Sequence, residues 1–267
     1  MNERMNIKKP YGAHHNCLRP ALCYVLGVMK GDAYLRKQEY HPSRKAEVLY
    51  GARCKHYEKL SKWLVALDAT DKEFVLKFAE MLEKVIRRPD HRRNDVALNI
   101  RTLKKENRKI LYRYSRGVTF FAKWLNTLTT SEIHDIILEN PAWFLRGFYD
   151  SEGNLYLKGW RANIFIYNTS LDSINLANEC LNKLNIKHQV AIARPAGTKV
   201  KLPNAKLLIT KTTLYAIRIS GHANVSCFVH LVGSYIPRKS PLPYPNCDCP
   251  ICTLLRSQKV VAKNECL

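Results

Sequence analysis

The sequence predicts an α+β protein built from two similar halves, each with the element order αββαββα. The first observation is a pair of related stretches, "YVLGVMKGDAYL" at 24–35 and "FLRGFYDSEGNLYL" at 144–157. Each is an apolar run that ends in a carboxylate. The second observation is that a similar series of strand-like and helix-like segments follows both stretches. Together these observations indicate an internal duplication.

The length and composition are compatible with two small domains that have real cores. The chain has 267 residues, of which 46% are hydrophobic, so it is long and apolar enough to fold. We expect an N-terminal extension at 1–18, a first subdomain at 19–139, a second subdomain at 140–237 and a Cys-rich C-terminal tail at 238–267.

The charge balance indicates a polyanionic partner. Lys and Arg number 44 against 22 Asp and Glu, a formal net charge of +22. Such a positive field favours nucleic acid first and an anionic membrane surface second, and a merely solvated basic surface is the alternative. The start of the chain has no apolar signal segment, no apolar run is long enough to span a bilayer, and the nine cysteines are odd in number. We therefore expect an intracellular, cytoplasmic protein associated with nucleic acid.

The two motif stretches correspond position by position at a constant separation of 120 residues. The matched pairs are Gly27 and Gly147, Gly31 and Ser151, and Asp32 and Glu152. Pro20 and Pro141 begin the two predicted helices, because the first helical position tolerates proline. The correspondence predicts two equivalent helices.

The segments after each motif repeat the same order. The first half contains strand-like segments at 45–53, 62–69, 95–103 and 108–115 and helical segments at 70–85 and 118–128. The second half contains a hairpin at 154–168, a capped helix at 169–185, strands at 187–194 and 214–220 and a helix at 224–233. Strand alternation places Arg113 and Arg218 on the sheet face opposite the apolar residues beside them.

The small residues of each motif predict close helix packing. Gly27 and Gly31 lie four residues apart, on one helix face, as do Gly147 and Ser151, and small residues at this spacing let two helix backbones approach. Crossing there would bring Asp32 and Glu152 together, and two adjacent carboxylates require a cation. Either motif alone is more often a simple helix-ending turn, but the duplication favours a Mg²⁺ site.

The two motifs resemble the signature helices of the LAGLIDADG homing endonucleases, in the single-chain form with two motifs. The matching residues are "VLGVMKGDA" at 25–33 and "LRGFYDSEG" at 145–153, and the resemblance continues to about Tyr235. The chain departs from the signature at Ala33, where glycine is usual, and at Lys30. Glu152 replaces Asp in a way that the family admits.

The resemblance implies homing-endonuclease-like subdomains with the paired motif helices at their interface, in a monomer with internal pseudo-twofold symmetry. It implies a site-specific double-strand DNA endonuclease of the intron-homing type. Such an enzyme hydrolyses phosphodiesters with divalent metal and leaves 3′ overhangs at a long recognition site. Asp32 and Glu152, with the backbone carbonyls of Gly31 and Ser151, would hold Mg²⁺ or Mn²⁺.

The resemblance also implies a basic catalytic residue near the metals. The candidates are Arg113, Arg218 and Lys158, for which simple phosphate contact is an equal alternative. Other DNA-binding residues are expected on the first hairpin of each half. These residues are Arg36, Lys37, Arg53 and Lys55 in the first half and Lys158 and Arg161 in the second.

The tail contains a dense group of cysteines outside the resemblance. Cys247, Cys249, Cys252 and Cys266 suggest a structural Zn²⁺ site, with His230 as another candidate for the fourth ligand. Free thiols or a disulfide are the alternatives.

Two other functions fit the same scaffold. One is an intron maturase, which binds intron RNA as a splicing cofactor. The other is a DNA-binding module without catalysis, which the two filled acidic positions, Asp32 and Glu152, disfavour.

Overall fold

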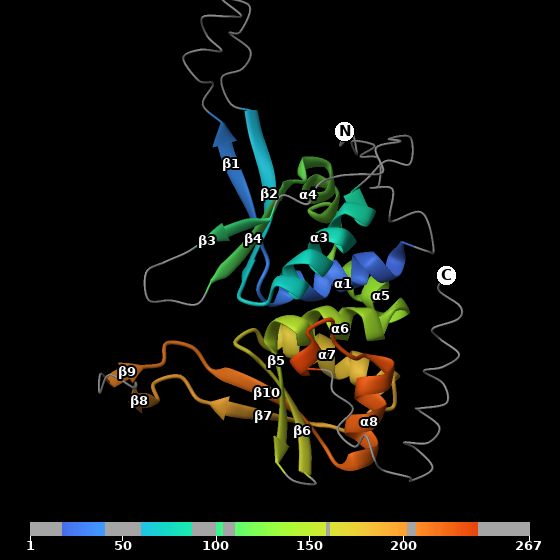
Figure 1. Ribbon diagram of the computed structural model, residues 1–267, viewed down its shortest axis with the longest axis vertical. Helices are drawn as coiled ribbons and strands as arrows, with labels where there is room; N and C mark the ends of the chain where they lie inside the picture. The colour runs from blue at the N-terminus through green and yellow to red at the C-terminus, as the bar shows by residue number, and fades with distance from the viewer. Residues whose placement is uncertain are drawn as a thin grey trace, which may run out of the picture. The chain divides into compact units, whose positions relative to one another are not determined.

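A computed structural model describes residues 18–40, 60–86, 100–103, 110–158, 161–201 and 207–239 (Figure 1). The chain forms two compact units, which are described separately. Unit 1 comprises Met1–Leu22 and Asp32–Ile133, and unit 2 comprises Cys23–Gly31 and His134–Leu267. Helix α1 (Arg19–Lys30) is therefore divided, and most of it belongs to unit 2.

Unit 1 contains a four-stranded antiparallel sheet with the strand order β1-β2-β4-β3. Its strands are β1 (Tyr34–Tyr40), β2 (Leu60–Ala69), β3 (Arg101–Leu103) and β4 (Leu111–Gly117). Its helices are α3 (Lys72–Ile86) and α4 (Thr119–Leu125), and α5 (Thr130–Glu139) begins here and ends in unit 2. Figure 1 shows α3 and α4 on one side of this sheet.

The core of unit 1 forms because the apolar stripe of α3 meets the apolar face of the sheet. Phe74, Phe78 and Leu82 of α3 are fully buried, and α3 packs on β2 and β4. The Phe78 ring meets the Tyr114 ring of β4 edge-on, with centroids 6.4 Å apart. The helices thus cover one face of the sheet, and alternate residues of each strand lie on the other.

Unit 2 contains a second four-stranded antiparallel sheet, with the order β5-β6-β10-β7, and a two-stranded pair, β8-β9. Its strands are β5 (Gly153–Lys158), β6 (Arg161–Asn168), β7 (Gln189–Arg194), β8 (Lys199–Lys201), β9 (Leu207–Ile209) and β10 (Leu214–Ser220). Its further helices are α6 (Pro141–Glu152), α7 (Leu171–Lys183), α8 (His222–Leu231) and the 3₁₀ turn η3 (Pro237–Lys239). The two four-stranded sheets have the same topology.

The core of unit 2 lies between its sheet and α7 and α8. Ile164 and Ile166 of β6 pair with Ile219 and Ile217 of β10, and all four side chains are fully buried. The N-terminus of α7 is capped by Ser170, whose side chain accepts a hydrogen bond from the Ser173 amide, which satisfies one of the unpaired amides of the first turn. The helices α7 and α8 both pack on β6 and β10.

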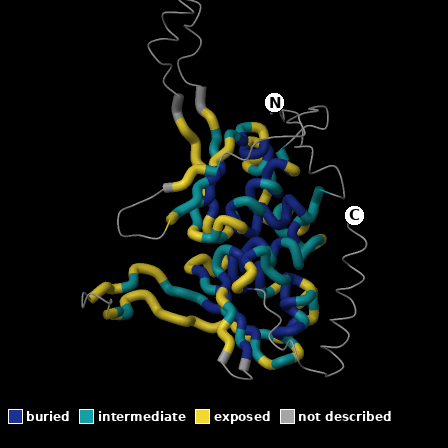
Figure 2. Tube along the Cα trace, in the orientation of Figure 1, coloured by how far each residue is buried: buried dark blue, intermediate teal, exposed yellow. Residues whose placement is uncertain are grey.

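The strands β7 and β9 are exposed along their whole length (Figure 2). Several of their large apolar side chains face solvent, among them Ile192 at 59% and Leu207 at 70% exposure. In Figure 2 this part of unit 2 is mostly yellow.

The expected α+β fold with paired strands and flanking helices is confirmed, and most elements fall where the sequence places them. The structure adds α5 and the β8-β9 pair, which the sequence did not predict. It also places the expected first hairpin of the first half, with Arg36 and Lys37, on β1, a strand whose bounds the sequence did not locate. The strand expected at 45–53 lies outside the described residues. Among the described helices, none has the length and apolar character that a membrane span requires.

Candidate active site at the ends of the motif helices

The motif helices α1 and α6 touch through their backbones at two glycines. A Cβ atom added to Gly27 would lie 2.2 Å from the carbonyl oxygen of Phe144, and one added to Gly147 would lie 2.2 Å from the carbonyl oxygen of Tyr24. No side chain fits at either distance. The two glycines therefore allow the close helix packing that the sequence predicts, and the part of α1 involved belongs to unit 2.

The crossing is symmetric in detail. The same added Cβ atoms would approach the backbone nitrogens of Phe148 and Val28. Tyr24 and Phe144, like Val28 and Phe148, are separated by the 120 residues that separate the glycines. The two helices thus present equivalent atoms to each other, as the duplication requires.

The crossing continues to the carboxyl ends of the helices. A Cβ atom on Gly31 would lie 2.4 Å from Cβ of Ser151 and 3.0 Å from Cγ of Glu152. Gly31 is followed by Asp32, an exposed residue in the turn before β1, and Glu152 is the last residue of α6. The small residue at position 31 therefore leaves room for the end of α6.

A buried amide that the sequence analysis missed joins these two helix ends. The side-chain amide of Asn168, at the end of β6, donates to the Glu152 carboxylate at 3.1 Å and to the Lys30 carbonyl at 3.3 Å. Its own oxygen accepts from the Ser170 amide at 2.7 Å. A signal was available, because strand alternation places Asn168 on the same apolar face as Ile164 and Ile166.

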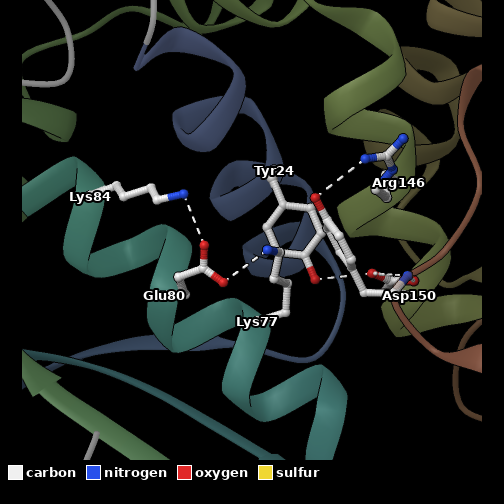
Figure 3. A network of polar contacts seen from close by, with 7 residues as sticks. Tyr24, Lys77, Glu80, Lys84, Arg146 and Asp150 are labelled. Atoms are coloured by element: carbon white, nitrogen blue, oxygen red, sulfur yellow. Dashed lines mark hydrogen bonds and ion pairs between the residues drawn. The ribbon is translucent and has the colours of Figure 1, made fainter. Parts of the chain in front are cut away.

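A buried carboxylate, Asp150, lies in the last turn of α6 (Figure 3). It accepts hydrogen bonds from the Tyr24 hydroxyl at 3.0 Å, from the Ser234 hydroxyl and from the Tyr235 amide at 3.2 Å. Burial raises its pKa to about 6, although the hydrogen bonds from Ser234 and Tyr24 and the charge of Lys239 act in the opposite direction. Burial, followed by the neighbouring Asp150, also raises the pKa of Tyr24.

The segment after α8 holds the end of α6 from another side. The buried ammonium of Lys239 donates to the carbonyl oxygens of Asp150 at 2.6 Å and Tyr149 at 3.1 Å, and the Tyr149 hydroxyl donates to the Lys239 carbonyl at 3.0 Å. Arg146 donates to the Val232 carbonyl. A cation at the carboxyl end of a helix is favourable because the last carbonyls carry partial negative charge.

The donors at the end of α6 suit a hard divalent cation. The Glu152 carboxylate and the Ser151 backbone carbonyl are oxygen ligands, which Mg²⁺, Mn²⁺ and Ca²⁺ prefer over nitrogen or sulfur. Within the described part of the chain, no group of three His, Cys, Asp or Glu side chains could hold a metal ion. A site here would therefore combine carboxylates with backbone carbonyls and water.

The predicted basic residue Arg113 of β4 is already bound to a carboxylate. It donates from Nε and Nη2 to the two oxygens of Asp68 on β2, at 2.6 and 2.5 Å. This hydrogen bonding raises the pKa of Arg113, so the guanidinium stays protonated. It cannot serve as a proton acceptor.

Arg218 of β10 lies on the open face of the second sheet, as predicted. It donates from Nε at 3.4 Å and from Nη2 at 3.2 Å to Oδ1 of Asn163, and it lies over the ring of Phe165 at 5.9 Å. The Phe165 ring is stacked on Tyr167. Arg218 therefore lies beside two stacked aromatic rings on this face.

The structure describes only some of the other predicted DNA-binding residues. Arg36 and Lys37 are exposed on β1, and strand alternation puts them on opposite faces, with Arg36 beside the Tyr34 ring. Lys158 and Arg161 pair across β5 and β6, but their side chains are outside the description. The predicted residues outside the described ranges are Arg53, Lys55, Cys247, Cys249, Cys252 and Cys266, so the DNA-contact and zinc predictions for these positions stay predictions.

Relatives in Methanocaldococcus jannaschii show sequence similarity to the chain. Uncharacterized protein MJ0314 is 27% identical over 178 residues, which cover 64% of this chain and 56% of that protein. Uncharacterized protein MJ0398 is 24% identical over 222 residues, which cover 82% of this chain and 69% of that protein. The chain thus spans little more than half the length of the first of these relatives.

Comparisons with a protein family and with solved structures agree with the interpretation of the two motif helices. Residues 139–233 match the family described as LAGLIDADG-like domain. The structure of I-DmoI in complex with DNA and Ca aligns with a TM-score of 0.52 at 16% identity, covering 84% of this chain and 96% of that one. The structure of mesophilic variants of the homing endonuclease I-DmoI aligns with a TM-score of 0.50 at 17% identity, covering 81% and 96%. Residues 139–233 are therefore similar to the LAGLIDADG-like domain family, and the fold of the chain resembles that of the homing endonuclease I-DmoI.

Proposed function

We propose that the chain is a site-specific DNA endonuclease that hydrolyses one phosphodiester in each strand of a long duplex site and leaves 3′ overhangs. The observation that carries the proposal is the backbone-to-backbone crossing of the two motif helices at Gly27 and Gly147. Both helices lead directly into a carboxylate, Asp32 or Glu152. The similarity to I-DmoI and the net charge of +22 support DNA as the partner.

Asp32 and Glu152 are proposed to act as metal ligands, together with the carbonyls of Gly31 and Ser151. A bound Mg²⁺ or Mn²⁺ would activate water and stabilise the leaving oxygen. Structures of I-DmoI with DNA and Ca or Mn illustrate divalent cations in a similar fold. The Asn168 amide donates a hydrogen bond to one oxygen of the Glu152 carboxylate and so orients this group.

The test is cleavage of DNA by the purified full chain. A library of plasmids that carries intronless host-gene sequences would be incubated with Mg²⁺ or Mn²⁺, and linear products would be sequenced. We expect defined cut sites, with no cutting in EDTA. The variants Asp32→Asn and Glu152→Gln should bind the same duplex with unchanged affinity but fail to cut it.

The matched control is Asp135→Asn, which removes an exposed carboxylate of α5 and should leave cutting intact. Full activity of Asp32→Asn or Glu152→Gln would refute the site. Metal-independent cutting by the wild type would refute the mechanism.

The intron-maturase alternative makes a different prediction. A maturase would promote splicing of an intron RNA even when both carboxylates, Asp32 and Glu152, are replaced. The I-DmoI complexes to which the fold is similar contain DNA, so DNA is the partner we propose.

A further inference from the structure

Each four-stranded sheet carries an arginine on one of its two central strands, Arg113 on β4 and Arg218 on β10. A neighbouring side chain accepts hydrogen bonds from Nε and Nη2 of each arginine. Nε and Nη2 of Arg113 bind the carboxylate of Asp68, at 2.6 and 2.5 Å. Nε and Nη2 of Arg218 bind Oδ1 of Asn163, at 3.4 and 3.2 Å. In both cases the contact uses the Nε–Nη2 edge of the guanidinium group and leaves the Nη1–Nη2 edge, the end of the side chain, available.

The end that is left has a specific chemistry. A guanidinium has five N–H groups, and a contact through Nε and one hydrogen of Nη2 leaves both hydrogens of Nη1 and the second of Nη2. Within the described ranges no other hydrogen bond of Arg113 is recorded, and its side chain is 38% exposed. Two parallel N–H groups from Nη1 and Nη2 match O6 and N7 of guanine in the major groove.

The charge of Arg113 also favours base contact over phosphate contact. Asp68 cancels the charge of Arg113, so the pair attracts phosphates weakly and contributes little to counterion release. A partly exposed salt bridge of this kind stabilises a fold modestly, more so when it is bidentate as here. Its contribution to the sheet is compatible with a second role, because the contact leaves the Nη1–Nη2 end of the guanidinium group available. Holding a long side chain in place before binding does reduce the cost of ordering it on a partner.

Strand register confirms that the pair lies away from the helices. Arg113 pairs directly with Asp68 across β4 and β2, so both side chains lie on one face. The adjacent Tyr114 lies on the opposite face, where it is buried against α3 and donates to Glu83 at 2.7 Å. The Arg113–Asp68 pair is therefore on the open face of the first sheet.

We propose that Arg113 is a guanine-reading residue, oriented by Asp68, and that it sets base preference at one position of the DNA site. Arg218, held by Asn163, takes the same role in the second sheet while it keeps its charge. This inference rests on the proposed function as a site-specific DNA-binding enzyme. It assigns base recognition to two residues for which catalysis and phosphate binding were the expected roles.

The strand supplies its own control. Arg116 lies three residues after Arg113 and also binds a carboxylate, since its Nε is 2.9 Å from Oε1 of Glu83. Strand alternation places Arg116 on the opposite, helix-covered face of the sheet. Arg113→Lys and Arg116→Lys are therefore equal chemical changes on opposite faces.

The experiment is selection from a library of randomised DNA duplexes with the full chain in Ca²⁺, the cation present in a DNA complex of I-DmoI. Bound duplexes are sequenced for the wild type, Arg113→Lys, Asp68→Asn and Arg116→Lys. We expect the wild type to enrich a motif with a guanine whose preference falls about tenfold in Arg113→Lys, while other positions are unchanged. Arg116→Lys should enrich the wild-type motif.

The variant Asp68→Asn separates orientation from charge. It should weaken the preference for the same guanine and raise the affinity for unselected duplex, because it removes a negative charge from the DNA-binding face. If Arg113→Lys does not fold, as shown by the loss of its thermal unfolding transition, the guanine preference of Asp68→Asn tests the inference instead.

The outcomes distinguish the inference from the function on which it rests. A wild-type motif that persists unchanged in Arg113→Lys and in Asp68→Asn would overturn the inference alone. A uniform loss of affinity for all sequences in Arg113→Lys would mean phosphate contact and would also overturn it. If the wild type binds duplexes without enriching any motif, site-specific recognition fails and the inference fails with it.

Discussion

At the scale of single residues, the end of α6 depends on buried polar side chains. Asn168 holds the Glu152 carboxylate, and Asp150 ties the last turn of α6 to Tyr24 and to the chain after α8. Buried polar groups are costly unless they are paired, and these are paired several times over. Such pairing fixes the position of a neighbouring carboxylate better than apolar packing could.

Replacing Asn168 should separate positioning from binding. In Asn168→Ala the Glu152 carboxylate loses a donor, and we expect DNA cleavage at saturating Mg²⁺ to fall about 10- to 100-fold, as for other residues that orient metal ligands. DNA affinity without metal should not change. Single-turnover cleavage and a Mg²⁺ titration measure the two effects. Asn175→Ala, on an exposed face of α7, is the control, and equal activity of both variants would contradict the assignment.

The raised pKa of Asp150 predicts a pH dependence of stability. The carboxyl has a pKa of about 6 in the fold against an ordinary 3.8, so the folded state holds the proton more tightly than the unfolded state does. The free energy of unfolding therefore falls as pH rises from about 4 to about 6, by up to about 3 kcal/mol for this group. Asp150→Asn should lose this component.

Urea unfolding at several pH values from 4 to 7 tests this prediction. The quantity of interest is the difference in unfolding free energy between the wild type and Asp150→Asn, because other carboxylates titrate in the same range and cancel. That difference should change with pH, whereas the difference for the exposed Asp135→Asn should stay flat. A pH-independent difference for Asp150→Asn would refute the raised pKa.

At the scale of elements, the helix crossing is the feature on which the candidate site depends. Alanine normally stabilises a helix relative to glycine by about 1 kcal/mol or less. In Gly27→Ala we expect the opposite sign, with a loss of about 3 kcal/mol or more, because the new methyl group would overlap the Phe144 carbonyl.

Thermal or urea unfolding of Gly27→Ala and of Ser131→Ala, an exposed position of α5, provides the comparison. The control should change the unfolding free energy by less than about 0.5 kcal/mol. An unchanged or increased stability of Gly27→Ala would show that the helices do not meet at this glycine.

Much of this element pattern could be predicted because it is written in local periodicity. The repeat of small residues and carboxylates located α1 and α6, and apolar stripes located α3 and α7. Arg36 and Lys37 were expected on the first hairpin, but the bounds of β1 were not located because its sequence, "YLRKQEY", is mostly polar on both faces. The start of α5 could have been found, since Thr129 and Glu132 form a reciprocal capping box.

The contacts that define the candidate site could not be predicted in the same way. The Arg113–Asp68 pair joins residues 45 positions apart, and it depends on the register of β2 against β4. A shift of one residue would move Asp68 to the other face of the sheet. Alternation gave the face of Arg113 but not its partner, so the sequence alone favoured a catalytic or phosphate role.

At the scale of the whole molecule, the chain passes from one unit to the other within α1 and returns after it. Arg19–Leu22 belong to unit 1 and Cys23–Gly31 to unit 2, and the chain then returns to unit 1 at Asp32. One continuous helix therefore contributes to both compact units. Loss of α1 would remove the Gly27–Gly147 packing from unit 2 and would alter the connection to the first strand of unit 1.

The net charge of +22 predicts that affinity for DNA depends strongly on salt. If about six phosphates are neutralised on binding, affinity for a nonspecific duplex should fall roughly 1,000-fold between 50 and 200 mM salt. Fluorescence anisotropy with a labelled random duplex measures the slope. Lys62→Ala should make it shallower by about one unit, because Lys62 is an exposed cation on the first sheet. Arg113→Lys should change the slope little, since it keeps the positive charge that offsets Asp68. Tighter binding to anionic lipid vesicles than to duplex DNA would instead assign the positive surface to a membrane.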